Sequence, residues 1–463
     1  MDWARLAGAI LTVLASGYAA AAWWASRRPI AAPLVRSDDG LAPVTVLKPL
    51  CGDEPRLYRN LATFCRQRHP RFQLVFGVSE ADDAALPVVE RLRRAFPDCD
   101  IAVAIGAQGP AAARPNVTPI NPKVANLIAM LPLARHERLV IADSDIAVRA
   151  DYLRRVTAPL ADPRVGIVTC LYRGRPLRGA WARLGAQFID EWFVPAVRVA
   201  QAGGSQRFGF GATIALRHEV LLRIGGFAAV ADRLADDYWL GELTRRQGLL
   251  TVLSDVEVRT DIAETTPRAL WSHELRWLRT LRALDPAGFA LVFLTFTWPM
   301  LAFGLLLASS HAVALLAVLG VLARSARCRD AGAALRAPWR DALLLLEWAV
   351  AMAGRQVRWR GARLAIEWTR DGMASAAALS PGPSPTSGSG ENTSGPSPKQ
   401  RFAALSPASS PAGGRGENIG NSSSGSRFAP LSRLRERGCG RGPAHAKKTS
   451  PRPQHPSVSR RPR

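Results

Sequence analysis

The sequence predicts an α/β fold in which a mostly parallel sheet has helices on both sides, with transmembrane helices at both ends of this domain and a disordered tail. Apolar, β-rich runs alternate with helical stretches between residues 44 and 142, which is typical of parallel sheets. Residues 6–24 and 289–323 contain no Asp, Glu, Lys or Arg. Residues 381–463 contain only seven Val, Ile, Leu or Phe. We therefore divide the 463 residues into an anchor (1–28), an α/β domain (40–285), membrane or interfacial helices (286–374) and a tail (375–463).

The net charge of +24 is unevenly distributed along the chain. Residues 381–463 contain 14 Lys or Arg and 3 Asp or Glu, and thus hold +11 of the excess. This distribution argues against an ordinary soluble enzyme and against a uniformly basic nucleic-acid binder, so we expect no nucleic-acid partner. The six Cys residues lack CxxC or other metal-ligand spacing, which fits a reducing compartment.

The first apolar segment, Leu6 to Trp24, has 19 residues, enough to cross a hydrocarbon core of about 30 Å as a helix. Trp23 and Trp24 stand where interfacial aromatic residues are expected, and Arg27 and Arg28 follow them. A cleaved signal peptide is the alternative, although its apolar region usually has only about 7–15 residues. We expect a retained anchor whose C-terminal flank is cytoplasmic.

Residues 289–308 and 312–323 predict a helical hairpin in the membrane, and Arg324, Arg327 and Arg329 mark the return to the cytoplasm. Residues 342–353 predict a fourth crossing or a helix in the membrane interface, followed by an Arg-rich helix after residue 354. The tail contains a near-repeat without an apolar face, so we expect it to be disordered. The tail is either a basic arm that binds anionic lipid or nucleic acid, or a segment without a function.

The domain between these membrane segments begins with alternating strands and helices. The predicted strands are 44–50, 73–78, 101–105 and 138–142, and the predicted helices are 55–65, 86–96 and 124–133. Ligands of such sheets bind at the carboxyl ends of the strands. Asp83 and Asp143 lie just after strand ends, so we expect them to face one cleft.

Three polar motifs could supply the chemistry of this cleft. Asp143-Ser-Asp145 offers oxygen ligands to a divalent cation, although a turn or a helix cap is the simpler interpretation. Asp236-Asp237 precedes a helical stretch and indicates either an N-terminal cap or a general base. The segment His273 to Trp277 could bind phosphates, or it could be an amphipathic helix near the membrane with a snorkelling Arg and an interfacial Trp.

In their order and spacing, these motifs resemble those of the ceramide glucosyltransferase-like glycosyltransferases, which are membrane-bound nucleotide-sugar enzymes with the GT-A fold. The resemblance extends over residues 44–372. It is carried by the following motifs: Val44–Gly52, Asp82-Asp83, Asn121-Pro-Lys123, Asp143-Ser-Asp145, Ala235-Asp-Asp-Tyr238, and Arg276-Trp277 as the end of a (Q/R)xxRW motif.

The resemblance implies a role for each acidic residue. Asp83 would contact the uracil or ribose, Asp143 would hold the nucleotide-sugar, and Asp145 would bind the metal, Mg²⁺ or Mn²⁺. Asp237 would be the general base that deprotonates the acceptor hydroxyl.

The resemblance also implies roles for basic and aromatic residues. Arg276 and Trp277 would steady the diphosphate and the acceptor side, and Lys48 and Lys123 would contact the pyrophosphate or ribose. His273 departs from the pattern, because the family usually has Gln or Arg there, but His can still donate to a phosphate.

Among its relatives, the sequence is most similar to the bacterial hopanoid-biosynthesis glycosyltransferases. This implies inverting transfer of N-acetylglucosamine from UDP-N-acetylglucosamine to bacteriohopanetetrol by a multi-pass protein of the bacterial inner membrane, with its catalytic domain in the cytoplasm. A glucosyltransferase that uses UDP-glucose and ceramide or another lipid is the first alternative. A processive polysaccharide synthase and a non-enzymatic basic membrane-binding protein are the others.

Overall fold

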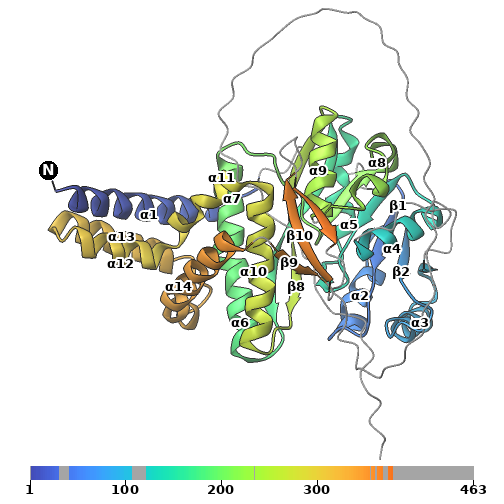
Figure 1. The fold of residues 1–463 in the computed structure, drawn as a ribbon. Coiled ribbons are helices and arrows are strands. Elements are labelled where there is room, and N and C mark those ends of the chain that lie inside the picture. Colours follow the sequence, from blue (N-terminus) through green and yellow to red (C-terminus); the bar gives the residue numbers. More distant parts are fainter. Residues whose placement is uncertain are drawn as a thin grey trace, which may run out of the picture.

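The computed structural model describes residues 2–30, 41–106, 121–233 and 235–354, together with the backbone of 356–359, 362–368 and 374–378. Figure 1 shows an α/β domain and a group of helices that projects from one side of it. The rest of the predicted tail, from residue 379 onward, lies outside the described residues.

An eight-stranded sheet forms the centre of the α/β domain, in the order β3-β2-β1-β4-β7-β6-β8-β5. Strands β3, β2, β1 and β4 run parallel to one another, β7 is antiparallel to both of its neighbours, and β5 is antiparallel to β8. The strands are β1 Val44–Pro49, β2 Phe72–Val78, β3 Asp100–Ile105, β4 Arg138–Ile141, β5 Ile146–Ala147, β6 Val165–Pro176, β7 Ile214–Arg217 and β8 Leu250–Ile262. The four predicted strands are the parallel half of this mixed sheet.

Helices cover both faces of the sheet because both faces of its central strands are apolar. In β1, Val44 and Val46 belong to one hydrophobic core and Leu47 belongs to the other. The helices of the domain are α2 Leu57–Cys65, α3 Leu86–Ala95, α4 Pro122–Met130, α5 Tyr152–Thr157, α6 Gly179–Phe188, α7 Val194–Ala202, α8 His218–Arg223, α9 Asp236–Arg246 and α10 Pro267–Leu284. The structure therefore confirms the predicted α/β fold with helices on both sides.

The projecting helices are α1 (Trp3–Arg27), α12 (Thr297–Leu307) and α13 (His311–Ser325), which lie side by side (Figure 1). Small residues allow this close packing: a side chain at Gly304 would collide with Thr12, and one at Gly320 would collide with Ser16. The Ser16 hydroxyl also donates to the backbone carbonyl of Leu316 at 3.0 Å. Small residues and hydroxyl hydrogen bonds of this kind are typical of helices that pack within a bilayer.

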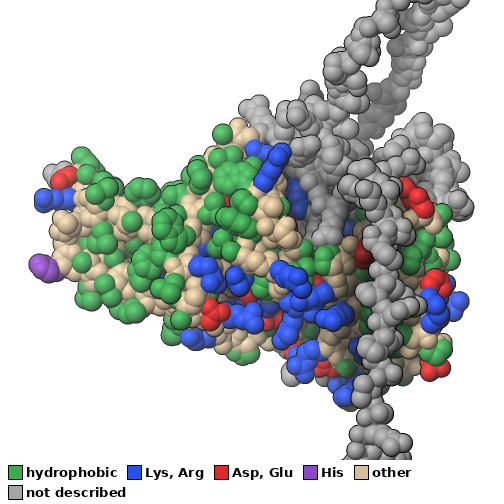
Figure 2. Space-filling model, turned by 90° about the horizontal axis from the view of Figure 1, so that it is seen from below, with side chains coloured by type: hydrophobic (Ala, Val, Ile, Leu, Met, Phe, Trp, Pro, Cys, Tyr) green, Lys and Arg blue, Asp and Glu red, His purple; other side chains and the backbone are tan. Residues whose placement is uncertain are grey.

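The outer surface of this three-helix bundle is apolar. Leu306, Leu315 and Leu322 are 80, 64 and 58% exposed, respectively. Figure 2 shows hydrophobic side chains along the projection, and Lys and Arg side chains gathered on the adjoining part of the domain. Within the described part of the chain, α1 is the one helix long and apolar enough to cross a membrane.

The predicted membrane span over residues 289–308 is wrong as a single helix. This segment is broken into α11 (Pro286–Ala290), a 3₁₀ turn (Val292–Thr295) and α12. The break arises because its first half packs on the α/β domain and on the helix Ala331–Ala353. The indole nitrogen of Trp192 in the domain donates to Thr295, and that of Trp348 in this helix donates to the Phe289 carbonyl, both at 2.9 Å. The 11 residues of α12 rise only about 16 Å, which is short of a complete crossing.

The predicted helix over 342–353 is the second half of α14 (Ala331–Ala353), which packs against α10 and α6 of the domain. The Arg-rich segment after residue 354 is not helical as predicted. Its backbone forms strands β9 (Gln356–Trp359), β10 (Ala362–Trp368) and β11 (Ala374–Ala378) of a small antiparallel sheet. Polar and apolar residues alternate in part of this segment, a pattern that is typical of a strand.

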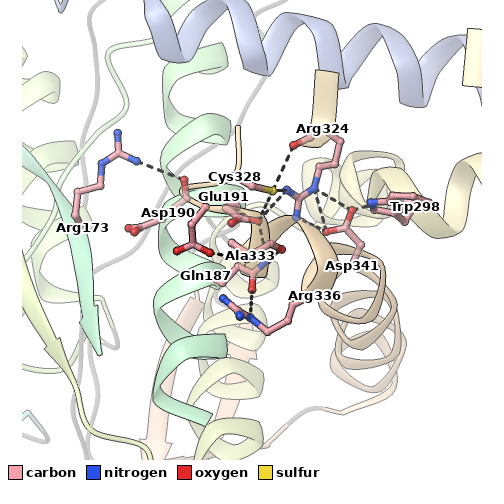
Figure 3. Close-up of polar contacts among 11 residues, drawn as sticks. Arg173, Gln187, Asp190, Glu191, Trp298, Arg324, Cys328, Ala333, Arg336 and Asp341 are labelled. Carbon is pink, nitrogen blue, oxygen red and sulfur yellow. Dashed lines mark hydrogen bonds and ion pairs between the residues drawn. The ribbon is translucent and has the colours of Figure 1, made fainter. Parts of the chain in front are cut away.

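A buried ionic network joins the membrane-side helices to the α/β domain (Figure 3). Arg324, at the end of α13, contacts Glu191 of the π-helical turn Ile189–Phe193 and Asp341 of α14, both at 2.8 Å. These three side chains are at most 4% exposed. A second buried arginine, Arg340, contacts Glu274 of α10 at 2.6 Å. Charges this deeply buried require their partners.

We predict that Arg324→Met will lower the free energy of unfolding by about 3–5 kcal/mol, because Glu191 and Asp341 would remain buried without their cation. Denaturant unfolding of the full chain in detergent measures this loss. Arg329→Met is the matched control: it removes an exposed arginine and should change stability by less than about 0.5 kcal/mol. Equal effects of the two substitutions would contradict the structural role of the network.

Candidate active site

The polar motifs meet where β1 and β4 end and where α4 and α9 begin. Asp143 and Asp145 follow β4, and Lys123 and Asp236 lie in the first turns of α4 and α9. The carboxyl ends of parallel strands form the usual ligand-binding edge of such sheets. The fold thus brings residues from distant parts of the sequence to one edge.

Lys123 is the central cation of this edge. Its ammonium lies 2.8 Å from Asp143 Oδ1 and 3.6 Å from Asp236 Oδ2, and its side chain is only 8% exposed. Burial opposes the charged form, but the carboxylates of Asp143, Asp236 and Asp237 outweigh this effect and raise the pKa of Lys123. Lys123 therefore keeps its charge and compensates part of the acidic cluster.

Asn121 fixes the start of α4 beside this cluster. Its side-chain oxygen accepts hydrogen bonds from the backbone N–H groups of Lys123 and Val124, at 3.0 and 3.4 Å, and so caps the helix. Its amide nitrogen donates to Asp236 at 3.2 Å. The predicted Asn-Pro-Lys motif is therefore a helix start that orients Lys123 and Asp236 together.

Lys48 lies beneath the loop that carries the two aspartates. Its amine donates to the backbone carbonyl of Asp143 at 2.7 Å and lies 3.7 Å from the ring centre of Phe64, and the residue is fully buried. Burial lowers the pKa of Lys48 to about 7, against the opposing effect of Asp143, Asp145 and Glu54. In this position Lys48 supports the loop from the interior of the domain.

Asp83 ties together the loops that follow β1 and β2. Its Oδ1 accepts hydrogen bonds from the backbone N–H groups of Gly52 at 2.9 Å and Ala85 at 2.8 Å. Gly52 has a φ of +67°, a conformation that glycine adopts without strain. Asp83 thus lies at the same strand edge as Asp143. The expectation that both face one cleft stays a prediction.

Asp145 points into the domain, with 4% of its surface exposed. Its Oδ2 accepts a hydrogen bond from Thr260 at 3.3 Å, and its carbonyl accepts one from the backbone N–H of Asp261 at 3.1 Å. Asp261 in turn contacts Arg175 at 2.7 Å. The end of β8 therefore holds Asp145 in place.

Asp237 is fully buried, and both of its carboxylate oxygens accept backbone hydrogen bonds. Gly211 N–H donates to Oδ2 at 2.7 Å, and Tyr238 N–H donates to Oδ1 at 2.8 Å. Burial and the adjacent charge of Asp236 raise the pKa of Asp237 well above that of an ordinary aspartate. The two neighbouring aspartates differ in environment, since Asp236 faces Lys123 and Asp237 faces the backbone.

The residues predicted on the acceptor side all belong to α10. Trp277 is 4% exposed and packs edge-on against Phe188 and Tyr172, with ring centres 5.4 and 6.3 Å away. The alternative of an interfacial tryptophan is therefore wrong, and Arg276 is likewise buried rather than snorkelling. His273 bonds through Nδ1 to Glu264 Oε1 at 2.6 Å.

Aromatic contacts connect Trp277 to the surroundings of Asp237. The ring of Trp277 lies 5.8 Å from that of Phe193, which lies 5.4 Å from that of Phe210. Phe210 immediately precedes Gly211, the donor to Asp237. The motif on α10 and the acidic pair of α9 are thus parts of one packed unit.

Comparison with models of known protein families identifies the family of this chain. The family model described as Glycosyl transferase family 21 matches residues 7–371. The chain belongs to glycosyl transferase family 21.

Some curated relatives are named ceramide glucosyltransferase. The enzyme named ceramide glucosyltransferase 3 of Caenorhabditis elegans is 24% identical over 256 residues, which cover 54% of this chain and 53% of the relative. A ceramide glucosyltransferase of Gibberella zeae is 30% identical over 161 residues, 34% of this chain and 30% of that relative. The chain spans about half the length of the C. elegans relatives that it matches.

A solved structure with a similar fold is the mannosyltransferase PcManGT from Pyrobaculum calidifontis, in complex with GDP-Man and Mn²⁺. It is 20% identical in sequence to this family 21 protein, and the match covers 76% of this chain and 97% of the mannosyltransferase, with a TM-score of 0.47.

The site of this family 21 protein contains side-chain oxygens of the kind that bind a divalent cation. Asp143 and Asp145 offer carboxylate oxygens, which Mg²⁺ and Mn²⁺ prefer, and Mg²⁺ sites often take only one or two carboxylates and complete their shell with phosphates and waters. Within the described ranges, no group of three or more His, Cys, Asp or Glu side chains is arranged to hold a metal.

Sequence reasoning missed two supporting residues of this family 21 protein. Asp261 lies at the end of β8 next to Asp145. The rule that ligand-binding residues lie at the carboxyl ends of strands, which located Asp143, could have found it. Glu264, the partner of His273, lies nine positions before it, in the connection to α10, and no local pattern marks it.

Proposed function

We propose that this protein is a membrane-bound inverting glycosyltransferase that transfers a sugar from a UDP-sugar to the hydroxyl group of a lipid. The observation that carries the proposal is the buried acidic edge around Lys123, in a family 21 chain whose neighbouring helices expose an apolar surface. The relatives named ceramide glucosyltransferase support a lipid acceptor.

In this proposal, Asp83 contacts the uracil or ribose, Asp143 holds the nucleotide-sugar, and Asp145 is the protein ligand of the cation. A bound Mg²⁺ or Mn²⁺ would supply positive charge to the departing diphosphate. Lys123 contributes its own charge on the donor side, because it keeps its proton beside Asp143. Lys48 holds the loop that carries Asp143.

The acceptor hydroxyl attacks the anomeric carbon in one displacement, and Asp237 takes its proton. The raised pKa of Asp237 suits a base that must accept a proton near neutral pH. Each of its oxygens already accepts one backbone hydrogen bond and keeps capacity for another. A single displacement inverts the configuration of the sugar, and the proposal assigns no residue as a covalent nucleophile.

The helices α1, α12 and α13 bring the site to the bilayer. Trp23 and Trp24 lie near the C-terminal end of α1, where Arg27 and Arg28 cover their rings at 4.4 and 3.9 Å. Tryptophans mark a membrane–water interface, and basic residues at one end of a span favour a cytoplasmic position for that end. We therefore place the catalytic domain on the cytoplasmic side of the bacterial inner membrane, with α12 and α13 entering the bilayer beside α1.

For the finer substrate choice, we propose UDP-N-acetylglucosamine as donor and bacteriohopanetetrol as acceptor, on the strength of the sequence resemblance to hopanoid-biosynthesis glycosyltransferases. Transfer of glucose from UDP-glucose to ceramide is the second candidate, and the names of the curated relatives favour it.

We predict that membranes containing the protein, supplied with UDP-N-acetylglucosamine and bacteriohopanetetrol, will form a hopanoid hexosaminide detectable by mass spectrometry of the extracted lipids. Parallel incubations with UDP-glucose and ceramide or diacylglycerol distinguish the alternatives. A ceramide hexoside would establish the second candidate, and the absence of any glycolipid with every donor and acceptor would refute the proposed function.

We predict that Asp237→Asn will lower kcat by about 10²–10⁴-fold, the usual contribution of a general base, and leave UDP-sugar binding nearly unchanged. Asp236→Asn is the matched comparison. Because Asp236 contacts Lys123 and Asn121, its loss should weaken donor binding more than it lowers kcat. Steady-state kinetics and UDP-sugar binding separate the two effects, and near-normal turnover by Asp237→Asn would remove Asp237 as the base.

A further inference from the structure

We propose that Glu264 is a positioning residue that orients His273 so that the Nε2 atom of this ring binds an anionic oxygen of the donor diphosphate. This inference rests on the proposed function, since it assumes a UDP-sugar at the acidic edge. It assigns a task to Glu264, which belongs to none of the motifs that the sequence analysis singled out, and it explains how a histidine can serve on α10.

Glu264 and His273 line a small pocket between α6, the end of β8 and α10. The other lining residues are mostly apolar: Gly185, Phe188, Ile189, Ile262, Leu270, Glu274 and Trp277. The pocket measures about 10 Å³, which is room for one water-sized group, so it fits a single oxygen atom of a larger ligand.

The pocket adjoins the proposed metal-binding motif. Ile262, one of its walls, directly follows Asp261, whose backbone N–H donates to the carbonyl of Asp145 at 3.1 Å. A diphosphate held at Asp143 and Asp145 would therefore lie beside the strand whose end forms one wall of this pocket. The adjacency argues for a phosphate oxygen as the group that enters the pocket.

The contact with Glu264 determines what His273 can do there. An ionised carboxylate only accepts hydrogen bonds, so Nδ1 of His273, 2.6 Å from Glu264 Oε1, carries the proton. Nε2 is buried and has no hydrogen-bond partner among the residues that the structure describes. In the protonated ring both nitrogens donate, which leaves Nε2 as a donor for an anion.

Two other groups near the ring bear on this assignment. Glu274 also lines the pocket, and its carboxylate shares the Arg340 cation with Glu347, at 2.6 and 3.0 Å. Trp277 packs edge-on to His273, with ring centres 5.7 Å apart, and its indole nitrogen is a second buried donor without a partner among the described residues. When His273 is protonated, its Nε2 and the Trp277 indole present two donors, which suit an anionic oxygen.

A double-mutant cycle in the full-length protein tests this pairing. Glu264→Ala should raise KM for the UDP-sugar so that kcat/KM falls about 10-fold or more, and Glu264→Gln, which keeps an acceptor for Nδ1, should recover most of the loss. His273→Gln supplies an amide donor that needs no carboxylate to orient it, so Glu264→Ala in that background should lower kcat/KM less than about 3-fold further. Glu90→Ala, at an exposed glutamate of α3, is the control and should leave kcat/KM unchanged.

Two results would overturn the proposal: an equal loss from Glu264→Ala with His273 or Gln at position 273, or no loss at all in the native background. If Glu264→Ala does not fold, as judged by thermal melting, Glu264→Met, which keeps the side-chain length but removes the acceptor for Nδ1, replaces it in the cycle and is decided by the same criterion. Equilibrium binding of UDP to the same variants gives a second readout. If the native protein forms no glycolipid but UDP binding shows the predicted coupling, the proposed function fails while the pairing of Glu264 with His273 stands.

Discussion

The candidate active site depends on one buried ammonium group, that of Lys123, which lies between the carboxylates of Asp143 and Asp236. These two aspartates come from segments 93 positions apart in the sequence, and without a cation they would repel each other in a region of low dielectric. Asn121 places Lys123 at the start of α4 and also donates to Asp236. The same contact therefore joins β4 to α9 and sets the electrostatics of the cleft.

A second set of buried charges fixes this cleft relative to the membrane-side helices. Arg324 joins α13 and α14 to the π-helical turn after α6 (Figure 3). Arg340 joins α14 to α10. The guanidinium of Arg198, on α7, donates to backbone carbonyls of Ala25 and Arg28 and so holds the end of α1 against the domain. Such ion pairs add little net stability but disfavour other arrangements, which suits an enzyme whose acceptor lies in a bilayer.

The sequence predicted those features that follow from local patterns. The first four strands and their helices were placed within about two residues, because alternating apolar runs and helical periods are local signals. The break at residues 291–296 was not predictable in this way, since it arises from contacts of Trp192 and Trp348 with a uniformly apolar segment. Strand ends located Asp83 and Asp143, and the same rule could have found Asp261, but Glu264 depends on a tertiary contact that no spacing reveals.

The central claim is that Lys123 compensates the acidic edge, and a double-mutant cycle with Asp236 measures this most directly. Urea unfolding of the full chain in detergent would compare Lys123→Met, Asp236→Asn and the double variant with the native protein. Lys123→Met should lower the free energy of unfolding by about 3–5 kcal/mol, and adding Asp236→Asn should restore part of that loss, because it removes a carboxylate left without its cation. Strictly additive losses would contradict the account.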